Sequence, residues 1–215
     1  METLDAIKKR ISVRKFKSKA VSKDTLLTIL EAGTRAPSAG NCQNWYFVVV
    51  DDKDKINRIA RATLQPETFY NVPYIVVVCS DATKIRSEFK QRGELYAIQN
   101  VAAAIENILL VATDQGVDSI WIGAFADETV KAVLKIPQEV DVHAILPFGY
   151  RDEVPFKTQR RTLSHVTWFN TWKNRVSHKT FFPLSQHVDK LKSKLKHRKI
   201  SKKRKASAKK KVSKK

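Results

Sequence analysis

The sequence has few cysteines and no long apolar run. Its 215 residues include two cysteines, Cys42 and Cys79, which are too few for a disulfide scaffold or a four-thiolate zinc site. The longest apolar runs, 45–50 and 72–79, have the length of strands and fall short of the about 20 residues that span a bilayer. Residues 1–10 contain no apolar signal core. We therefore expect a cytoplasmic protein that makes no membrane contact.

Several motifs that carry chemistry are also missing. The sequence contains no GxGxxG after a strand, no GxxxxGK[ST], no HExxH and no GxSxG, which argues against a Rossmann dinucleotide site, a P-loop, a zinc protease and a nucleophile elbow. The five histidines do not follow metal-ligand spacing. The sequence therefore predicts no metal site and no catalytic side chain.

Acidic residues are scarce beside basic ones. The chain has 21 Asp and Glu against 41 Lys and Arg, a net charge of +20, and residues 187–215 hold 15 of the basic residues with a single acid. This division predicts a folded domain over 1–186 and a disordered basic tail over 187–215. The tail is expected to bind polyanions such as nucleic acid without sequence preference. The alternative is a solubilising tail with no specific partner.

Helices and strands alternate along the first 150 residues. The pattern predicts helices from Ser22 to about Gly33, over 53–63, between Gly93 and Gly116, and over 127–134. It predicts strands over 45–50, 74–79, 119–124 and 142–149. The helix after Gly93 is rich in alanine and should be central. This order indicates an α/β or an α+β domain.

The first candidate site is the segment Arg10-Ile-Ser-Val-Arg14. In an extended chain, residues two apart share a face, so Arg10, Ser12 and Arg14 would point one way and the two apolar residues into the core. Two guanidiniums and a hydroxyl on one face suit a phosphate or a carboxylate. The alternative is a solvated basic stretch, because lysines surround the segment.

Three further signals are weaker when taken alone. The polar loop 37–44 precedes a strand, as a ligand loop on a rigid scaffold would, or it is a well-capped connection. Gly123 and Ala124 would let a flat group approach the backbone, or they allow close packing on the Ala-rich helix. Arg160 and Arg161 could close on the same anion as Arg14, or they form a surface pair.

In this order, these motifs resemble the nitroreductase family of FMN-dependent oxidoreductases. The family pattern RxSxR matches residues 10–14, PSxxNxQPW matches 37–45, and GYxxExP followed by RR matches 149–161, with Glu153 in the acidic position. The resemblance runs from about residue 3 to residue 172. It implies an α+β fold in which helices flank a sheet, and a homodimer with two FMN sites at the subunit interface.

The resemblance also assigns FMN contacts to residues of this chain. They are Arg10, Ser12, Arg14, Pro37, Ser38, Ala39, Asn41, Gln65, Gly123, Ala124, Arg160 and Arg161. The first three would hold the FMN phosphate and ribityl chain, and Arg160 or Arg161 would complete the grip on the phosphate.

The remaining contacts divide between the two subunits. By the resemblance, Ser38, Ala39 and Asn41 would reach the flavin held by the other subunit. Gln65 would meet the isoalloxazine ring, and backbone N–H groups near Gly123 would face the flavin N5.

The implied activity is transfer of a hydride from NADH or NADPH, through FMN, to a small acceptor such as a nitroaromatic or a quinone. One alternative is a nucleic-acid-associated protein that acts through its basic tail. Another is a family member with a different reaction, such as flavin fragmentation or dehalogenation. The sequence departs from the family pattern at Asn44, which replaces the proline before Trp45. We expect Asn44 to loosen that loop.

Overall fold

The computed structural model describes residues 1–174. It divides the chain into two compact units, Met1–Lys157 and Thr158–Lys215. The predicted domain boundary at residue 186 and the predicted basic tail 187–215 lie outside the described residues.

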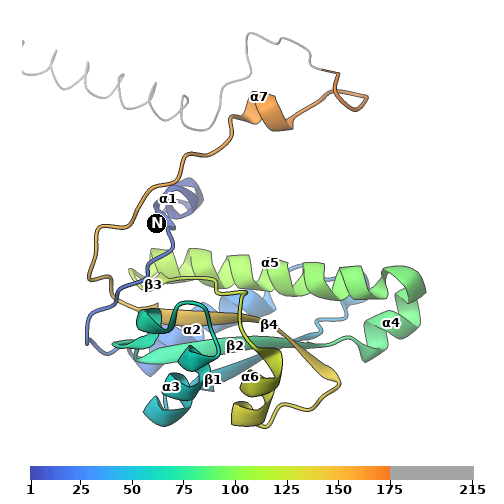
Figure 1. The fold of residues 1–215 in the computed structure, drawn as a ribbon. Coiled ribbons are helices and arrows are strands. Elements are labelled where there is room, and N and C mark those ends of the chain that lie inside the picture. The colour runs from blue at the N-terminus through green and yellow to red at the C-terminus, as the bar shows by residue number, and fades with distance from the viewer. Residues whose placement is uncertain (175–215) are drawn as a thin grey trace, which may run out of the picture. The chain divides into compact units, whose positions relative to one another are not determined.

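A four-stranded antiparallel sheet forms the centre of the first unit (Figure 1). In spatial order its strands are β1 (Trp45–Val50), β2 (Tyr74–Asp81), β4 (Val140–Gly149) and β3 (Asp118–Ser119). Because neighbouring strands are all antiparallel, the domain is α+β and not α/β. The fold class implied by the resemblance is therefore confirmed, whereas the implied dimer stays a prediction.

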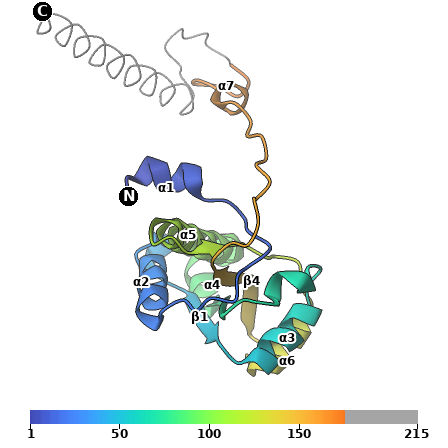
Figure 2. The same ribbon diagram turned by 90° about the vertical axis from the view of Figure 1, so that its left-hand side faces the viewer.

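Helices pack on both faces of this sheet or on the helices that cover it. They are α1 (Thr3–Lys9), α2 (Lys23–Thr34), α3 (Lys53–Arg61), α4 (Thr83–Phe89), α5 (Gly93–Asp114) and α6 (Asp127–Leu134), with short 3₁₀ turns at η1 (Ala39–Asn41), η2 (Pro66–Phe69) and η3 (Lys90–Arg92). Figure 2 shows α2 and α5 on one face, with α3 and α6 on the other. The predicted helices are confirmed, and Ser22 caps α2 by accepting the Thr25 N–H.

The central strand β2 explains the arrangement of the core. Val76 and Val78 pack into the cluster that contains α2 and α5. Ile75, Val77 and Cys79 pack into the cluster that contains α3 and α6. Successive side chains of a strand point to opposite faces, so a strand covered on both faces is apolar throughout. The continuous apolar run in the sequence reflects this double burial.

The predicted strand 119–124 is shorter in the structure. β3 pairs with β4 over Asp118 and Ser119 alone. Ile122 then forms a single bridge to Ile145, and Phe125 bridges Thr63. The segment leaves the sheet because its later residues bond to the chain that follows α3.

One helical stretch has the length and composition of a membrane span. Thr83–Asp114 contains an 18-residue window of mean hydropathy 1.5, although the chain bends at η3. A core helix of a globular domain meets the same criterion, and α5 buries its apolar stripe against α2 and β2.

The described part of the second unit, 158–174, contains one short helix, α7 (Leu163–Val166). After it, the rings of Trp168 and Trp172 pack with their centroids 4.1 Å apart. Arg160 and Arg161 lie in this unit, and both are exposed.

Candidate functional site

The RxSxR segment lies along the end of the sheet where β3 is found. Ser12 forms a parallel bridge with Ser119, and the Val13 N–H donates to the Ser119 carbonyl at 3.1 Å. Val13 is fully buried, which fixes the segment on the core, while Arg14 is exposed. Arg10 and Ser12 are half-buried, as is Ile11. The predicted alternation is confirmed for Val13 and Arg14.

Arg14 reaches a second predicted site residue. Its Nε donates to Oε1 of Gln65 at 3.2 Å. Gln65 is held in turn, because its backbone N–H donates to the Thr63 hydroxyl at 3.3 Å. The structure therefore brings the guanidinium of the RxSxR segment and the amide that follows α3 into direct contact, although 51 residues separate them.

The backbone around Gly123 lies against the same chain segment as Gln65. Phe125 bridges Thr63, and the Ala126 N–H donates to the Ala62 carbonyl at 2.8 Å. A Cβ added at Gly123 would meet a single neighbour within 4 Å, the indole Nε1 of Trp121 at 3.8 Å. Gly123 is exposed, so this backbone is uncovered, and the approach of a flat ligand to it stays a prediction. The alternative, close packing on the Ala-rich helix, is wrong for Gly123.

Glu153 holds the main chain of the RxSxR segment, a role that the sequence analysis did not assign. Its carboxylate accepts the backbone N–H of Arg14 at 2.6 Å and that of Lys15 at 3.2 Å. These bonds fix the main chain from which the Arg14 side chain projects. The available signal was the Glu153 position in the GYxxExP pattern, but 139 residues separate it from Arg14.

Arg10 faces a carboxylate, whereas Arg14 bonds to an amide. Its guanidinium lies 3.8 Å from a carboxylate oxygen of Glu106 on α5. Glu106 is half-exposed, and such ion pairs contribute little free energy in water. An anionic ligand can therefore replace Glu106 as the partner of Arg10 at small cost.

The loop 37–44 lies at the opposite end of the sheet. Trp45, which follows it, pairs with Ser80 of β2, whereas Tyr74 at the other end of β2 pairs with Phe148. Phe148 in turn pairs with Ser119. The two halves of the predicted site are thus about 20 Å apart along β2, at about 3.3 Å per residue. One chain does not bring Ser38, Ala39 and Asn41 to Arg14.

The loop forms a compact turn. Gly40, Asn41 and Gln43 all have positive φ, between 45° and 56°. Ser38 closes the turn by accepting the Gln43 N–H at 3.2 Å, and the Gln43 amide donates to Oδ1 of Asn41 at 2.9 Å. Pro37 and Asn41 are exposed. The turn therefore presents its polar residues outward.

Asn44 does not loosen this loop, and that expectation is wrong. Its side chain is buried, and its Oδ1 accepts from Nδ2 of Asn100 on α5 at 2.7 Å. Its carbonyl accepts the Asp81 N–H at 3.1 Å. A buried amide with matched partners fixes a chain in place, so Asn44 anchors the base of the loop to α5 and to the end of β2.

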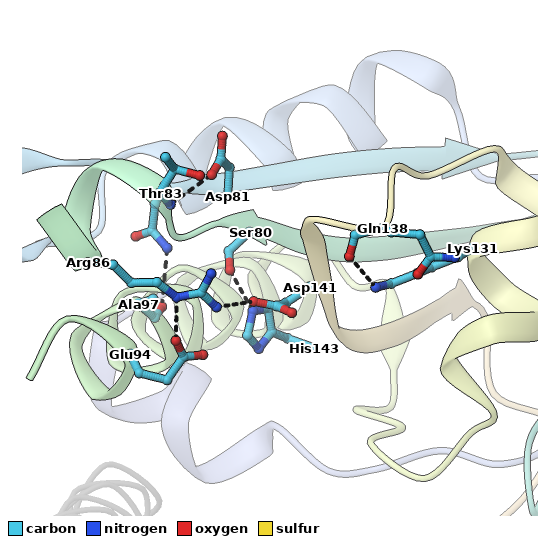
Figure 3. Close-up of polar contacts among 11 residues, drawn as sticks. Ser80, Asp81, Thr83, Arg86, Glu94, Ala97, Lys131, Gln138, Asp141 and His143 are labelled. Atoms are coloured by element: carbon cyan, nitrogen blue, oxygen red, sulfur yellow. Dashed lines mark hydrogen bonds and ion pairs between the residues drawn. The ribbon is translucent and has the colours of Figure 1, made fainter. Parts of the chain in front are cut away.

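A polar cluster occupies the same end of the sheet (Figure 3). Arg86 of α4 bonds to Glu94 at 2.6 Å and to Asp141 at 3.2 Å. The Ser80 hydroxyl lies 2.7 Å from Nε2 of His143. Burial lowers the pKa of His143, against the opposing charges of Asp141 and nearby acids. These groups therefore find their partners within the chain at this end of the sheet.

One part of the predicted site, the pair Arg160 and Arg161, lies in the second unit. Their grip on the FMN phosphate therefore stays a prediction. Within residues 1–174, no group of three or more His, Cys, Asp or Glu side chains is placed to hold a metal ion.

The chain is similar to several proteins of one family. The nitroreductase family model matches residues 7–68 and 61–150. A putative NADH dehydrogenase/NAD(P)H nitroreductase of Archaeoglobus fulgidus is 33% identical over 160 residues, 72% of this chain and 89% of that protein. An iodotyrosine deiodinase of Thermotoga neapolitana is 25% identical, over 78% of this chain and 97% of its own. A 5,6-dimethylbenzimidazole synthase of Rhodospirillum rubrum is 29% identical, over 71% and 83%.

Solved structures have the same fold. A nitroreductase family protein of Clostridium novyi superposes with a TM-score of 0.66 at 29% identity, covering 84% of this chain and all of that one. An FMN-dependent nitroreductase of Clostridium difficile gives a TM-score of 0.66 at 29% identity, covering 78% and 98%. The family model extends over more than half of the chain, including the RxSxR segment, Gln65 and Gly123. The protein therefore belongs to the nitroreductase family.

Proposed function

We propose that this protein is an FMN-dependent oxidoreductase that passes a hydride from NADH or NADPH to a small acceptor such as a nitroaromatic or a quinone. The observation that carries the proposal is the meeting of Arg14 with Gln65 beside the open backbone of Gly123. An always-charged donor, an amide and an uncovered strip of backbone lie together there. Named reductases among the relatives support the same activity.

The residues present fit FMN. Arg14 is exposed and cationic, and Ser12, two residues before it, adds a hydroxyl, which together suit a phosphate. Gln65 offers a donor and an acceptor to the polar edge of a ring. A flat ring needs close approach to main chain, which Gly123 allows because a Cβ-sized space beside it is free.

The division of labour follows from this fit. FMN, when bound, supplies the hydride chemistry, and the protein supplies orientation and electrostatics. Arg14 and Arg10 would hold the phosphate, and Glu153 would keep the Arg14 main chain in place. Gln65 would orient the ring. The Arg14–Gln65 bond positions these two groups relative to each other.

A homodimer is part of the proposal. Ser38, Ala39 and Asn41 lie about 20 Å from the Arg14 half of the site within one chain, by the strand geometry of β2. A second copy of the chain would bring its own turn to the Arg14 half, and two such sites would form per dimer. This separation supports the sharing of each FMN site between two subunits, which the resemblance implies. Arg160 or Arg161 would complete the phosphate grip.

The test is an absorption spectrum of the purified protein. We expect flavin bands at about one FMN per chain, bleached by NADH or NADPH without oxygen and restored by a quinone or a nitroaromatic. A colourless protein that FMN does not reconstitute would refute the proposal. Comparison of the two nucleotides identifies the reductant.

A second candidate keeps the flavin and changes the reaction. The names of two relatives, a deiodinase and a 5,6-dimethylbenzimidazole synthase, favour testing dehalogenation and flavin fragmentation alongside acceptor reduction. A halogenated phenol added to the reduced protein would release halide in the first case. In the second, the flavin absorption would disappear and not return with oxygen.

Polyanion binding by residues 187–215 is a separate proposal. It predicts that the full chain binds nucleic acid without sequence preference and that binding weakens steeply with salt. Binding that salt does not change would contradict it.

A further inference from the structure

Two buried amides connect helix α5 to the turn at residues 38–41. Asn44 and Asn100 are 6% and 4% exposed, and Nδ2 of Asn100 donates to Oδ1 of Asn44 at 2.7 Å. Oδ1 of Asn100 accepts the N–H of Ala39 at 2.9 Å. On the other side, Nδ2 of Asn44 lies 3.5 Å from the Ala97 carbonyl.

The backbone fixes which way both amides face. The Ala39 N–H can only donate, so Asn100 must present its oxygen to Ala39 and its nitrogen to Asn44. The Ala97 carbonyl can only accept, so Asn44 must present its nitrogen there and its oxygen to Asn100. Both ends of the chain of bonds demand the same orientation. Neither amide can turn over without leaving a buried polar group unpaired, which costs about 1–3 kcal/mol.

We propose that Asn100, oriented by Asn44, is a positioning residue of the flavin site. By holding Ala39, it fixes the turn in the shape in which Ser38, Ala39 and Asn41 meet the FMN of the partner subunit. The inference rests on the proposed function. It assigns to α5 a role in flavin binding that does not depend on a contact between α5 and the flavin.

The turn needs such an anchor because of its own conformation. Gly40 and Asn41 both have positive φ, which is costly for a residue other than glycine. The turn closes on itself through Asn41 N–H to Ser38 O and Cys42 N–H to Ala39 O, each at 3.0 Å. The bond to Asn100 attaches it to a buried helix. Release of Ala39 would let the turn relax and spread over several shapes.

The test compares two substitutions at each amide. Asn100→Leu and Asn44→Leu remove the amides at similar volume. Asn100→Asp keeps an acceptor for the Ala39 N–H, and Asn44→Asp keeps an acceptor for Nδ2 of Asn100. All four disturb a buried polar pair and should lower stability. The Asp variants, however, retain the bond that holds the turn.

We expect the dissociation constant of FMN to separate the two kinds of variant. In titrations of the apoprotein well below the unfolding temperature, Asn100→Leu should weaken FMN binding roughly tenfold or more. Asn44→Leu should weaken it less, and the double Leu variant should be no weaker than Asn100→Leu, because Asn44 acts through Asn100. Both Asp variants should stay within roughly threefold of the natural chain.

A matched control lies on the same helix. Nδ2 of Asn107 donates to the Ala32 carbonyl at 3.2 Å, away from the turn. Asn107→Leu should lower the unfolding temperature and leave FMN affinity unchanged. If FMN affinity instead follows stability across all the variants, Asn107→Leu included, the positioning role is refuted.

The outcomes also distinguish this inference from the proposed function. If the natural chain binds no FMN, the proposed function falls, and this inference with it. If the natural chain binds FMN and a folded Asn100→Leu variant binds it equally well, this inference alone falls. Where the Leu variants do not fold, the Asp variants decide. A large loss of FMN affinity in a folded Asn100→Asp variant refutes the role of the Ala39 bond.

Discussion

Both ends of the sheet hold paired polar side chains, Arg86 with Glu94 near Ser80 and Arg151 with Asp118 near Ser119, but the second end also has open main chain beside an exposed cation. At the end near Ser80, polar side chains bond to each other: Arg86 joins Glu94 and Asp141, and Ser80 joins His143. At the end near Ser119, Arg14 is exposed and a Cβ-sized space at Gly123 is free.

This difference indicates how a ligand-binding surface can be recognised when no ligand is bound. Where a protein satisfies its own polar groups, it builds rigidity. Where cationic donors stay at the surface beside open main chain, a partner is expected to supply the missing contacts. By this criterion, and under the proposed function, the Ser119 end would receive the phosphate and the ring, and the Ser80 end would shape the turn offered to a second copy.

The largest effect on stability is expected at Gly93, where atoms of the protein already fill the space beside Cα. A Cβ there would lie 2.6 Å from the Arg86 Cα and 2.7 Å from the Ile85 carbonyl oxygen. Gly93→Ala should lower the free energy of unfolding by about 3 kcal/mol, the upper part of the range for overpacking. Urea denaturation measures it. Gly116→Ala, where nothing lies within 4 Å of the added Cβ, should cost about 1 kcal/mol, from its positive φ alone.

The next effect concerns Arg14. Arg14→Ala removes a charge-assisted contact and should weaken FMN binding roughly 10- to 100-fold, measured by titration of the apoprotein. Arg58→Ala on α3 removes the same charge from an exposed position and serves as the control. Equal FMN affinity in the Arg14 variant and the control would remove the phosphate assignment.

Gly123 differs from Gly93 in having free space where a Cβ would stand. Gly123→Ala adds a methyl group in open space, so unfolding should change by less than about 0.5 kcal/mol. The same methyl group would stand where the flavin ring is proposed to approach, and FMN affinity should fall roughly tenfold. A variant that is both stable and fully flavinated would show that the ring lies elsewhere.

The smallest effect is the pH dependence at the Ser80 end. Burial lowers the pKa of His143 below its ordinary value, against Asp141, Glu94 and Asp127. The unfolded chain therefore binds more protons below about pH 6.5. Stability should be fully present above that pH and fall below it. In His143→Gln, which keeps a partner for Ser80, the urea midpoint should depend less on pH across this window. An unchanged slope would exclude His143 as the cause.

Local patterns were sufficient for most of the fold. The strand 45–50 and the helix 127–134 have the predicted bounds, because apolar periodicity and capping residues act over a few neighbouring residues. The strand 119–124 was overestimated because its apolar residues pack in the cluster with α3 and α6 and pair with β4 beyond Ser119 only through the single bridge from Ile122 to Ile145. Periodicity reports burial but not the partner of a backbone N–H.

The sequence predicted which residues form the candidate site, but it did not predict which of them contact each other. The types of Arg14 and Gly123 suggested their chemistry, the family resemblance added Gln65, and the structure showed that Arg14 contacts Gln65. Glu153 was missed as the anchor of Arg14, and Asn44 was misjudged. In both cases the partner lies far along the chain, and the bond depends on packing that no local pattern encodes.

The sequence by itself determined most of the elements, the family resemblance and the residue types of the candidate site, because these depend on short-range propensity and on motifs. Tertiary structure alone decided that Arg14 and Gln65 meet while the turn at 38–41 lies at the far end of β2. It also decided that Asn44 is an anchor. The physical reason is that long-range hydrogen bonds and burial arise from how the sheet and helices pack, and a buried amide is fixed by partners that the linear order does not place beside it.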